Sequence, residues 1–180
     1  MNMTTQSNAA GHQTGSSMVE VLVSLLILGV GLLGAVSLQS NGLNSNQRAV
    51  FVTEAQVLAQ DMADRILAYG DGPAGANGGE YDDITTKNNP NAATTCAFTN
   101  TGCNPTQTKA NDGYEWQQLF ASANSSLPGA YGAVKWNDPV YTITIYWDQD
   151  RTGAKKEDCT KNDKSADGYL TCFQMELGMN

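Results

Sequence analysis

The sequence predicts an α+β protein in which a long amino-terminal helix packs on a small antiparallel β-sheet. An uncharged apolar run at 21–38 is followed by an amphipathic segment at 51–69, and the two are predicted to form one helix. A second helical pattern comes next, and the strand patterns come last. Helices followed by strands favour an α+β arrangement over a parallel α/β one.

The first half of the predicted helix carries a single acid, close to its start. After Glu20 no charged residue occurs until Arg48, and the apolar run at 21–38 is long enough to cross a membrane. A carboxylate at the margin of hydrocarbon is costly without a partner, so Glu20 is a candidate functional residue. A secretory signal cleaved near 35–40 is the alternative, but the run is longer than such a signal's apolar core and lacks its basic start.

The second half of the predicted helix carries a single apolar stripe that is able to hold a small domain. Its members recur at steps of three and four: Phe51, Ala55, Leu58, Met62, Ile66 and Tyr69. The whole helix is expected to span 17–69 and to end at the Gly-Asp-Gly-Pro sequence at 70–73.

The segment at 71–110 is rich in Gly, Asn, Asp, Pro and Thr and is expected to form a long surface connection. A second helix is predicted over 113–123, with Asp112 as its N-cap. Four of its apolar residues share one face: Trp116, Leu119, Phe120 and Ala123. A Leu-Pro-Gly turn at 127–129 follows.

Three strands are predicted in the last third of the chain. The ranges 141–147 and 169–177 alternate with a period of two, and a weaker strand is expected over 131–136. The three tryptophans are interpreted as packing residues rather than as a binding surface.

Composition limits the size and the partners of the chain, which has 180 residues and a formal net charge of −8. This length fits one domain with an anchor rather than two full domains. Phosphate binding requires clustered cations, whereas the only local group of cations, at 151–164, is interleaved with acids. We therefore expect no nucleic acid as the main partner.

The four cysteines, Cys96, Cys103, Cys159 and Cys172, are predicted to form disulfides, which persist in an oxidising compartment. Three pairings are possible. The pairs Cys96–Cys103 and Cys159–Cys172 are favoured because each closes a short local loop. Zinc is the alternative, but the chain has no Cys-x-x-Cys and no His-containing ligand pair, so no metal site is expected.

The amino terminus resembles the class III signal of type IV pilins and pseudopilins in its Gly-Ser-Ser-Met-Val-Glu sequence, followed by an apolar helix. In that family a prepilin peptidase cuts after the glycine, and the new amino terminus is N-methylated. The resemblance therefore implies cleavage after Gly15, methylation of Ser16 and an assembly role for Glu20. The segment at 1–14 contains no Lys or Arg, so the expected orientation also rests on the resemblance.

Later segments resemble the type IV pilus modification proteins, the PilV-like minor pilins, at 55–65, 115–119, 127–129 and 141–148. The resemblance implies a leader peptide at 1–15, a long helix at 16–70 with a transmembrane half, and a pilin-like head at 71–180. It also implies a single-pass protein of the inner membrane whose head is periplasmic, and extracellular once the subunit enters the pilus.

The function that this resemblance implies is non-catalytic. A minor pilin helps to prime pilus assembly at the tip and supports adhesion and twitching motility through the pilus. The implied partners are other minor pilins, the major pilin, the prepilin peptidase and the inner membrane. A minor pseudopilin of a type II secretion system is the first alternative, since it shares the amino-terminal chemistry.

A membrane-anchored periplasmic binding domain or enzyme is the second alternative, and the residues give it little support. His12 is the only histidine and lies in the expected leader, so the mature chain would lack a histidine base. The segment at 148–159 begins like a calcium loop, but Cys159 occupies the position of the bidentate glutamate. We expect no catalytic site and no cofactor.

Overall fold

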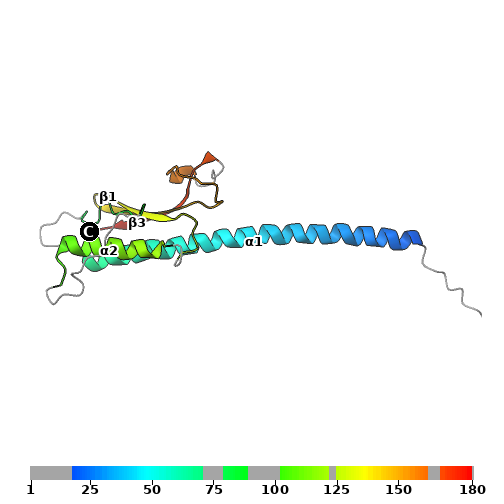
Figure 1. Ribbon diagram of the computed structural model, residues 1–180, viewed down its shortest axis with the longest axis horizontal. Helices are drawn as coiled ribbons and strands as arrows, with labels where there is room; N and C mark the ends of the chain where they lie inside the picture. Colours follow the sequence, from blue (N-terminus) through cyan, green and yellow to red (C-terminus); the bar gives the residue numbers. More distant parts are fainter. Residues whose placement is uncertain (1–17, 71–78, 89–101, 122–124, 162–166, 180) are drawn as a thin grey trace, which may run out of the picture. The chain divides into compact units, whose positions relative to one another are not determined.

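The computed structural model describes residues 18–70, 79–88, 102–121, 125–161 and 167–179. In chain order, its elements are α1 (Met18–Tyr69), α2 (Pro105–Leu119), β1 (Tyr131–Asn137), β2 (Val140–Trp147), the short 3₁₀ helix η2 (Cys159–Lys161) and β3 (Thr171–Gly178) (Figure 1). The chain divides into two units, Met1–Ser45 and Asn46–Asn180, and α1 contributes to both. The second unit, which we call the head, therefore includes the second half of α1.

The three strands of the head form one antiparallel sheet in the order β1-β2-β3. Ile143 in the central strand lies opposite Val134 on β1 and Met175 on β3. All three predicted strands are present. The last begins at Thr171 rather than at Tyr169, because Tyr169 forms an isolated parallel bridge with Lys156.

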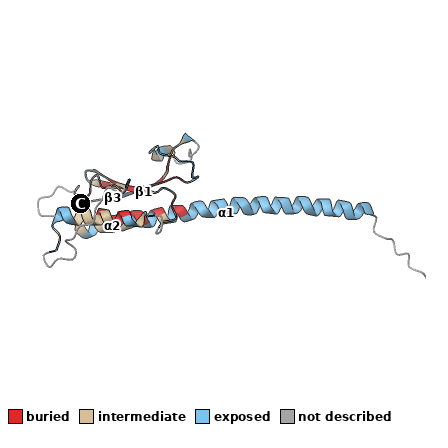
Figure 2. Cartoon of the chain, viewed as in Figure 1, coloured by how far each residue is buried: buried red, intermediate tan, exposed pale blue. Residues whose placement is uncertain are grey.

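The second half of α1 packs on this sheet through the predicted stripe. Five of its members are buried: Phe51, Ala55, Leu58, Met62 and Ile66. Figure 2 shows that the buried residues of α1 are confined to this half. The helix ends where predicted, since Gly70 adopts a positive φ of 69° and its N–H donates to the carbonyl of Ile66. A long helix on a small antiparallel sheet confirms the predicted α+β, pilin-like fold.

The prediction for the second helix was wrong at both ends. α2 begins at Pro105 instead of residue 113 and ends at Leu119 instead of residue 123. Its N-cap is Asn104, whose side chain accepts the N–H of Gln107 at 2.9 Å, while the Gln107 side chain accepts the N–H of Asn104 at 3.0 Å. This capping box, with proline in the first turn, starts the helix earlier than the apolar pattern indicated. Asp112 is therefore an interior residue of α2.

The predicted surface connection at 71–110 was also partly wrong. Within it, residues 79–88 contribute Tyr81 and Ile84 to the core. The carbonyl of Ile84 accepts the N–H of Val134 at 2.8 Å, so this segment pairs with the outer side of β1. Two large apolar side chains in a polar stretch are enough to bring it into the core, because their burial is favourable.

Trp116 joins the layers of the head. Its side chain is fully buried, and its indole N–H donates to the carbonyl of Leu58 on α1 at 2.8 Å. On the sheet side the ring lies over Gly132, where an added Cβ would come within 2.1 Å of the indole. Trp147 is buried as well, and Trp136 packs against Tyr141 in a half-buried position. The predicted packing role of the tryptophans is confirmed.

Candidate functional site

The most prominent candidate is the first half of α1, residues 18–45, which we call the apolar half. Its 18-residue most apolar window has no residue buried within the described chain, and it is long and apolar enough to cross a membrane. Its large side chains are exposed, and examples are Leu22, Leu25, Leu33 and Leu38. Exposed apolar surface on this scale is typical of a membrane segment or of an interface with other apolar helices.

Glu20 lies in the first turn of α1 and is exposed. Its carboxylate is placed favourably, because the amino-terminal end of a helix carries partial positive charge. The Ser24 hydroxyl donates to the backbone carbonyl of Glu20 at 2.8 Å, a bond within the helix. Gly15 and Ser16, the predicted cleavage and methylation residues, lie outside the described residues. Their relation to Glu20 remains a prediction.

The glycines in the first half of α1 are not explained by packing against the described part of the chain. A Cβ added at Gly29, Gly31, Gly34 or Gly42 would meet nothing within 4 Å. Glycine in a helix interior costs about 1 kcal/mol relative to alanine. In membrane helices, small residues allow close approach of a second helix.

A cluster of charges around Arg65 fixes α1 to α2 within the head. The guanidinium donates to Asp61 on the same helix and to Glu115 on α2, each at 2.7 Å, and lies 3.5 Å from Asp112. Burial alone would lower the pKa of Arg65, but the hydrogen bonds to Asp61 and Glu115 outweigh it and raise that pKa. The same contact lowers the pKa of Glu115.

Tyr81 extends this cluster to the segment at 79–88, because its hydroxyl donates to the Asp112 carboxylate. Burial and this hydrogen bond both raise the pKa of Tyr81. The cluster was not predicted from the sequence. The pair Asp61 and Arg65 at i and i+4 was a visible signal, whereas the partners on α2 come together only in the folded head.

Glu54 holds the segment that follows α2. Its carboxylate accepts the hydroxyl of Ser125 at 2.7 Å and the backbone N–H of Ser126 at 2.9 Å. Burial would raise the pKa of Glu54, but the hydrogen bonds from the two serines outweigh it and lower that pKa. An acid outside the predicted apolar stripe of the helix therefore has a structural role.

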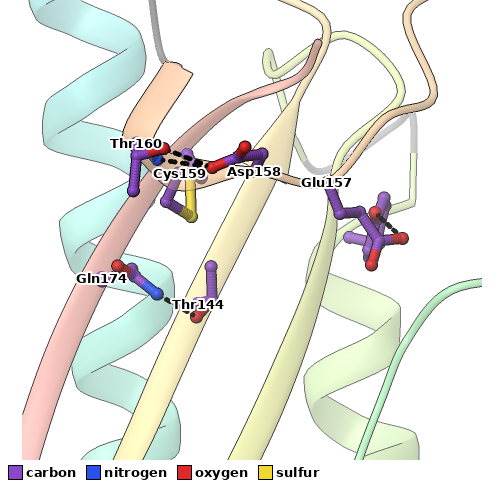
Figure 3. Close-up of a disulfide and its surroundings, with 8 residues drawn as sticks. Thr144, Glu157, Asp158, Cys159, Thr160 and Gln174 are labelled. Carbon is purple, nitrogen blue, oxygen red and sulfur yellow. Dashed lines mark hydrogen bonds between the residues drawn. A yellow bond between two sulfur atoms is a disulfide. The ribbon is translucent and has the colours of Figure 1, made fainter.

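The predicted Cys159–Cys172 disulfide is confirmed and joins η2 to β3, with Cα atoms 5.6 Å apart (Figure 3). The neighbouring Glu157 accepts hydrogen bonds from the ammonium group of Lys87 and from the hydroxyl of Tyr131, the latter at 2.5 Å. Both contacts lower the pKa of Glu157. The loop before β3 is thus fixed to β1 and to the segment at 79–88.

Only one cysteine of the other predicted disulfide lies within the described residues. Cys103 is disulfide-bonded, whereas Cys96 lies outside the described residues, so the pairing Cys96–Cys103 stays a prediction.

In the segment at 148–159, the carboxylate that would begin a calcium loop instead binds backbone N–H groups of the same segment. The Asp148 carboxylate accepts the N–H groups of Thr152, Gly153 and Ala154, which makes it a turn-forming residue.

An open cavity of about 490 Å³ lies beside the disulfide loop, and its volume is within the range of small-molecule sites. Its lining includes Lys155, Tyr131 and the buried Leu170. Lys87 also lines it, but its ammonium group is already paired with Glu157. The pairing of Lys87 with Glu157 helps to hold the loop before β3 in place. The residues that line the cavity do not indicate a reaction.

Comparisons of the chain with protein-family models, with curated proteins and with solved structures found no match. A relation to type IV pilins therefore rests on the amino-terminal sequence, on the later segments that resemble minor pilins and on the α+β fold.

Proposed function

We propose that this protein is a minor pilin, a non-catalytic subunit that is held in the inner membrane and then incorporated into a type IV pilus. In this role it helps to prime assembly at the tip and supports adhesion and twitching motility through the pilus. The observation that supports this proposal best is the exposed apolar half of α1, which carries Glu20 in its first turn and continues into the core helix of the head. Its partners are other minor pilins, the major pilin and the prepilin peptidase.

The proposed mechanism depends on charge matching at the start of the helix. Cleavage after Gly15 creates an ammonium group at Ser16, about one helical turn from Glu20. Each subunit then carries one positive and one negative group at the membrane edge. In a filament, Glu20 of one subunit pairs with the amino terminus of a neighbour, because a charge in apolar surroundings is tolerated only when matched.

The apolar half supplies the remaining contacts with neighbouring subunits. Its glycines have space beside them, so a second helix is able to approach the backbone closely. Meanwhile the Arg65 cluster and the Cys159–Cys172 disulfide keep the head folded as one unit. The chain thus combines an assembly helix with a rigid head.

The first test is mass spectrometry of the mature amino terminus. We expect a chain that begins with methylated Ser16. An intact Met1, or a start beyond Ser37, would contradict prepilin processing and would favour the uncleaved or secreted alternatives.

The second test changes Glu20→Ala and measures the protein in sheared pili and in membranes. We expect incorporation into pili to fall by at least about tenfold while membrane insertion is kept, because the charge partner is lost. Asp64→Ala, which removes an exposed acid on the same helix, is the matched control and should assemble normally. Normal assembly of Glu20→Ala would rule out charge matching.

The pseudopilin alternative gives a different outcome in the same strains. It predicts the same methylated amino terminus, but deletion of the gene would abolish secretion of folded proteins and leave pili intact. The binding-domain alternative predicts an unmethylated chain, because anchoring alone requires no prepilin processing.

A further inference from the structure

We propose that the outer edge of β3 receives an extended strand from another protein. We call this surface the β3 edge and define it by two sets of residues on the strand. The backbones of Gln174, Glu176 and Gly178 supply its hydrogen-bonding groups, and the side chains of Phe173, Met175 and Leu177 supply its apolar row. The proposal requires only the folded sheet and does not depend on pilus assembly.

The two edges of the sheet differ. On the β1 side, the segment at 79–88 donates and accepts backbone hydrogen bonds, with the N–H of Thr86 on the carbonyl of Gly132 at 2.9 Å. An isolated antiparallel bridge between Thr85 and Ala133 closes that side. On the β3 side, no strand within the described ranges pairs with the sheet. Among the described residues, the β3 edge is therefore the open one.

The register shows which backbone groups of β3 point outward. Met179 donates its N–H to the carbonyl of Pro139 at 2.9 Å, so Met179 faces β2. Antiparallel strands alternate between residues whose backbone groups face the partner and residues whose groups face away. Leu177 and Met175 therefore bond to β2, whereas the N–H and C=O groups of Glu176 point outward. The groups of Gln174 and Gly178 point outward by the same alternation.

The side chains at this edge are only partly covered. In the central strand, Ile143 and Ile145 are 0% exposed, whereas their partners Met175 and Phe173 on β3 remain half-buried. An added strand would place alternate side chains beside Phe173, Met175 and Leu177 and would cover this row. Backbone bonds then provide affinity, and the apolar row provides selectivity.

The opposite face of the strand indicates the charge of the occupant. Gln174 and Glu176 are exposed, and Glu176 is the only charged residue of β3. Gln174 donates its side-chain amide to the Thr144 hydroxyl at 3.3 Å (Figure 3). Glu176 is therefore the group that meets a new neighbour. A positive and a negative side chain that face each other across two paired strands stabilise the pairing. The occupant therefore carries Lys or Arg opposite Glu176.

A second copy of this chain fits the edge poorly. Antiparallel pairing of two β3 edges over 174–178 places Glu176 against Glu176, and like charges directly opposite each other are destabilising. The net charge of −8 on each chain adds to the repulsion. The occupant is therefore an extended segment of a different protein, with alternate apolar residues and a cation between them.

The test uses the full-length chain in lipid nanodiscs and a phage-displayed library of random nine-residue peptides as the probe. We expect enriched peptides that alternate apolar residues with Lys or Arg. Glu176→Pro should weaken their binding by at least about tenfold, because proline removes an outward N–H and its ring blocks the approach of a strand. The backbone hydrogen bonds between β3 and β2 do not use that N–H, so the variant should keep its folded sheet.

Glu176→Ala is the matched control, since it removes the same charge and keeps the N–H group. We expect it to weaken binding by only a few fold. Amide hydrogen exchange on the unmodified chain gives a second measurement that does not depend on a variant. Bound peptide should slow exchange at Gln174, Glu176 and Gly178 by at least about tenfold.

Three outcomes would overturn the proposal. One is a library without enriched peptides, and another is enriched peptides whose binding is unchanged in Glu176→Pro and whose addition leaves those amides unprotected. The third is self-association of the unmodified chain that Glu176→Ala strengthens and Glu176→Pro abolishes, which would make a second copy the occupant.

Discussion

Between residues 18 and 45, the large apolar side chains of α1 are exposed, whereas between 46 and 69 the apolar stripe is buried against α2 and the sheet. Within the first half, the run at 21–38 is apolar on every side, whereas the second half carries polar residues on the face away from the core. The presence of Leu and Val does not by itself separate these environments, since both halves contain them. The distribution of apolar residues around the helix axis does, because a stripe matches one packed partner and a uniform surface requires an apolar medium.

The largest expected effect compares truncation of one apolar side chain in each half. Met62→Ala should lower the free energy of unfolding of the head by about 2–5 kcal/mol, because Met62 is fully buried. Leu26→Ala should leave that value within about 0.5 kcal/mol, since Leu26 is 67% exposed.

Urea unfolding of the full chain in detergent micelles, followed by tryptophan fluorescence, measures both variants. Equal losses in the two variants would show that the apolar half contributes to the core of the head, and the contrast between the halves would fail.

An intermediate effect compares two arginines of α1. Arg65→Gln should destabilise the head by about 1–3 kcal/mol, because carboxylates on both α1 and α2 lose their cation. Arg48→Gln is the matched control and should cost less than about 0.5 kcal/mol, since Arg48 and Asp150 form a solvated pair at 3.5 Å. The same unfolding measurement applies, and similar costs for the two variants would show that the Arg65 cluster is no stronger than a surface ion pair.

The smallest effect concerns pH. The folded pKa values of Glu54 and Glu115 lie below the ordinary glutamate value. Their contribution to stability is therefore complete above about pH 5 and is lost as pH falls through the folded pKa values. We expect less than about 1 kcal/mol from each, since both carboxylates are partly solvated.

Glu54→Gln provides the check on this pH dependence. The difference in unfolding free energy between the unmodified chain and Glu54→Gln should shrink from pH 6 to pH 3. A constant difference would show that the hydrogen bonds from Ser125 and Ser126 do not favour the charged form.

Local periodicity accounts for what the sequence predicted correctly. The stripe from Phe51 to Ile66 and the alternation of β2 each repeat several times within one element, and burial follows both patterns. The Cys159–Cys172 pair was also predictable, because a short loop brings the two residues together. The amino-terminal motif predicted Glu20 as a site, and the structure places it at the start of the exposed apolar half.

Most of what the sequence did not predict required information from distant parts of the chain. Tyr81 and Ile84 lie in a polar stretch. Their burial follows from the backbone hydrogen bonds of this segment to β1 and from its packing on the core. The start of α2 depended on one reciprocal contact between Asn104 and Gln107, which the composition of the surrounding segment obscured. Likewise, the role of Glu54 was not predictable from the local pattern, because its serine partners come from beyond α2.

The close approach of Trp116 to Gly132 restricts how this head is able to diverge. Any side chain at position 132 would overlap the indole, and a smaller residue at 116 would leave a void and remove the hydrogen bond from the indole to the Leu58 carbonyl. The two positions therefore constrain each other although they are far apart in the chain. In relatives that share this head, glycine at 132 is expected to be inherited together with tryptophan at 116, and loss of one should accompany replacement of the other.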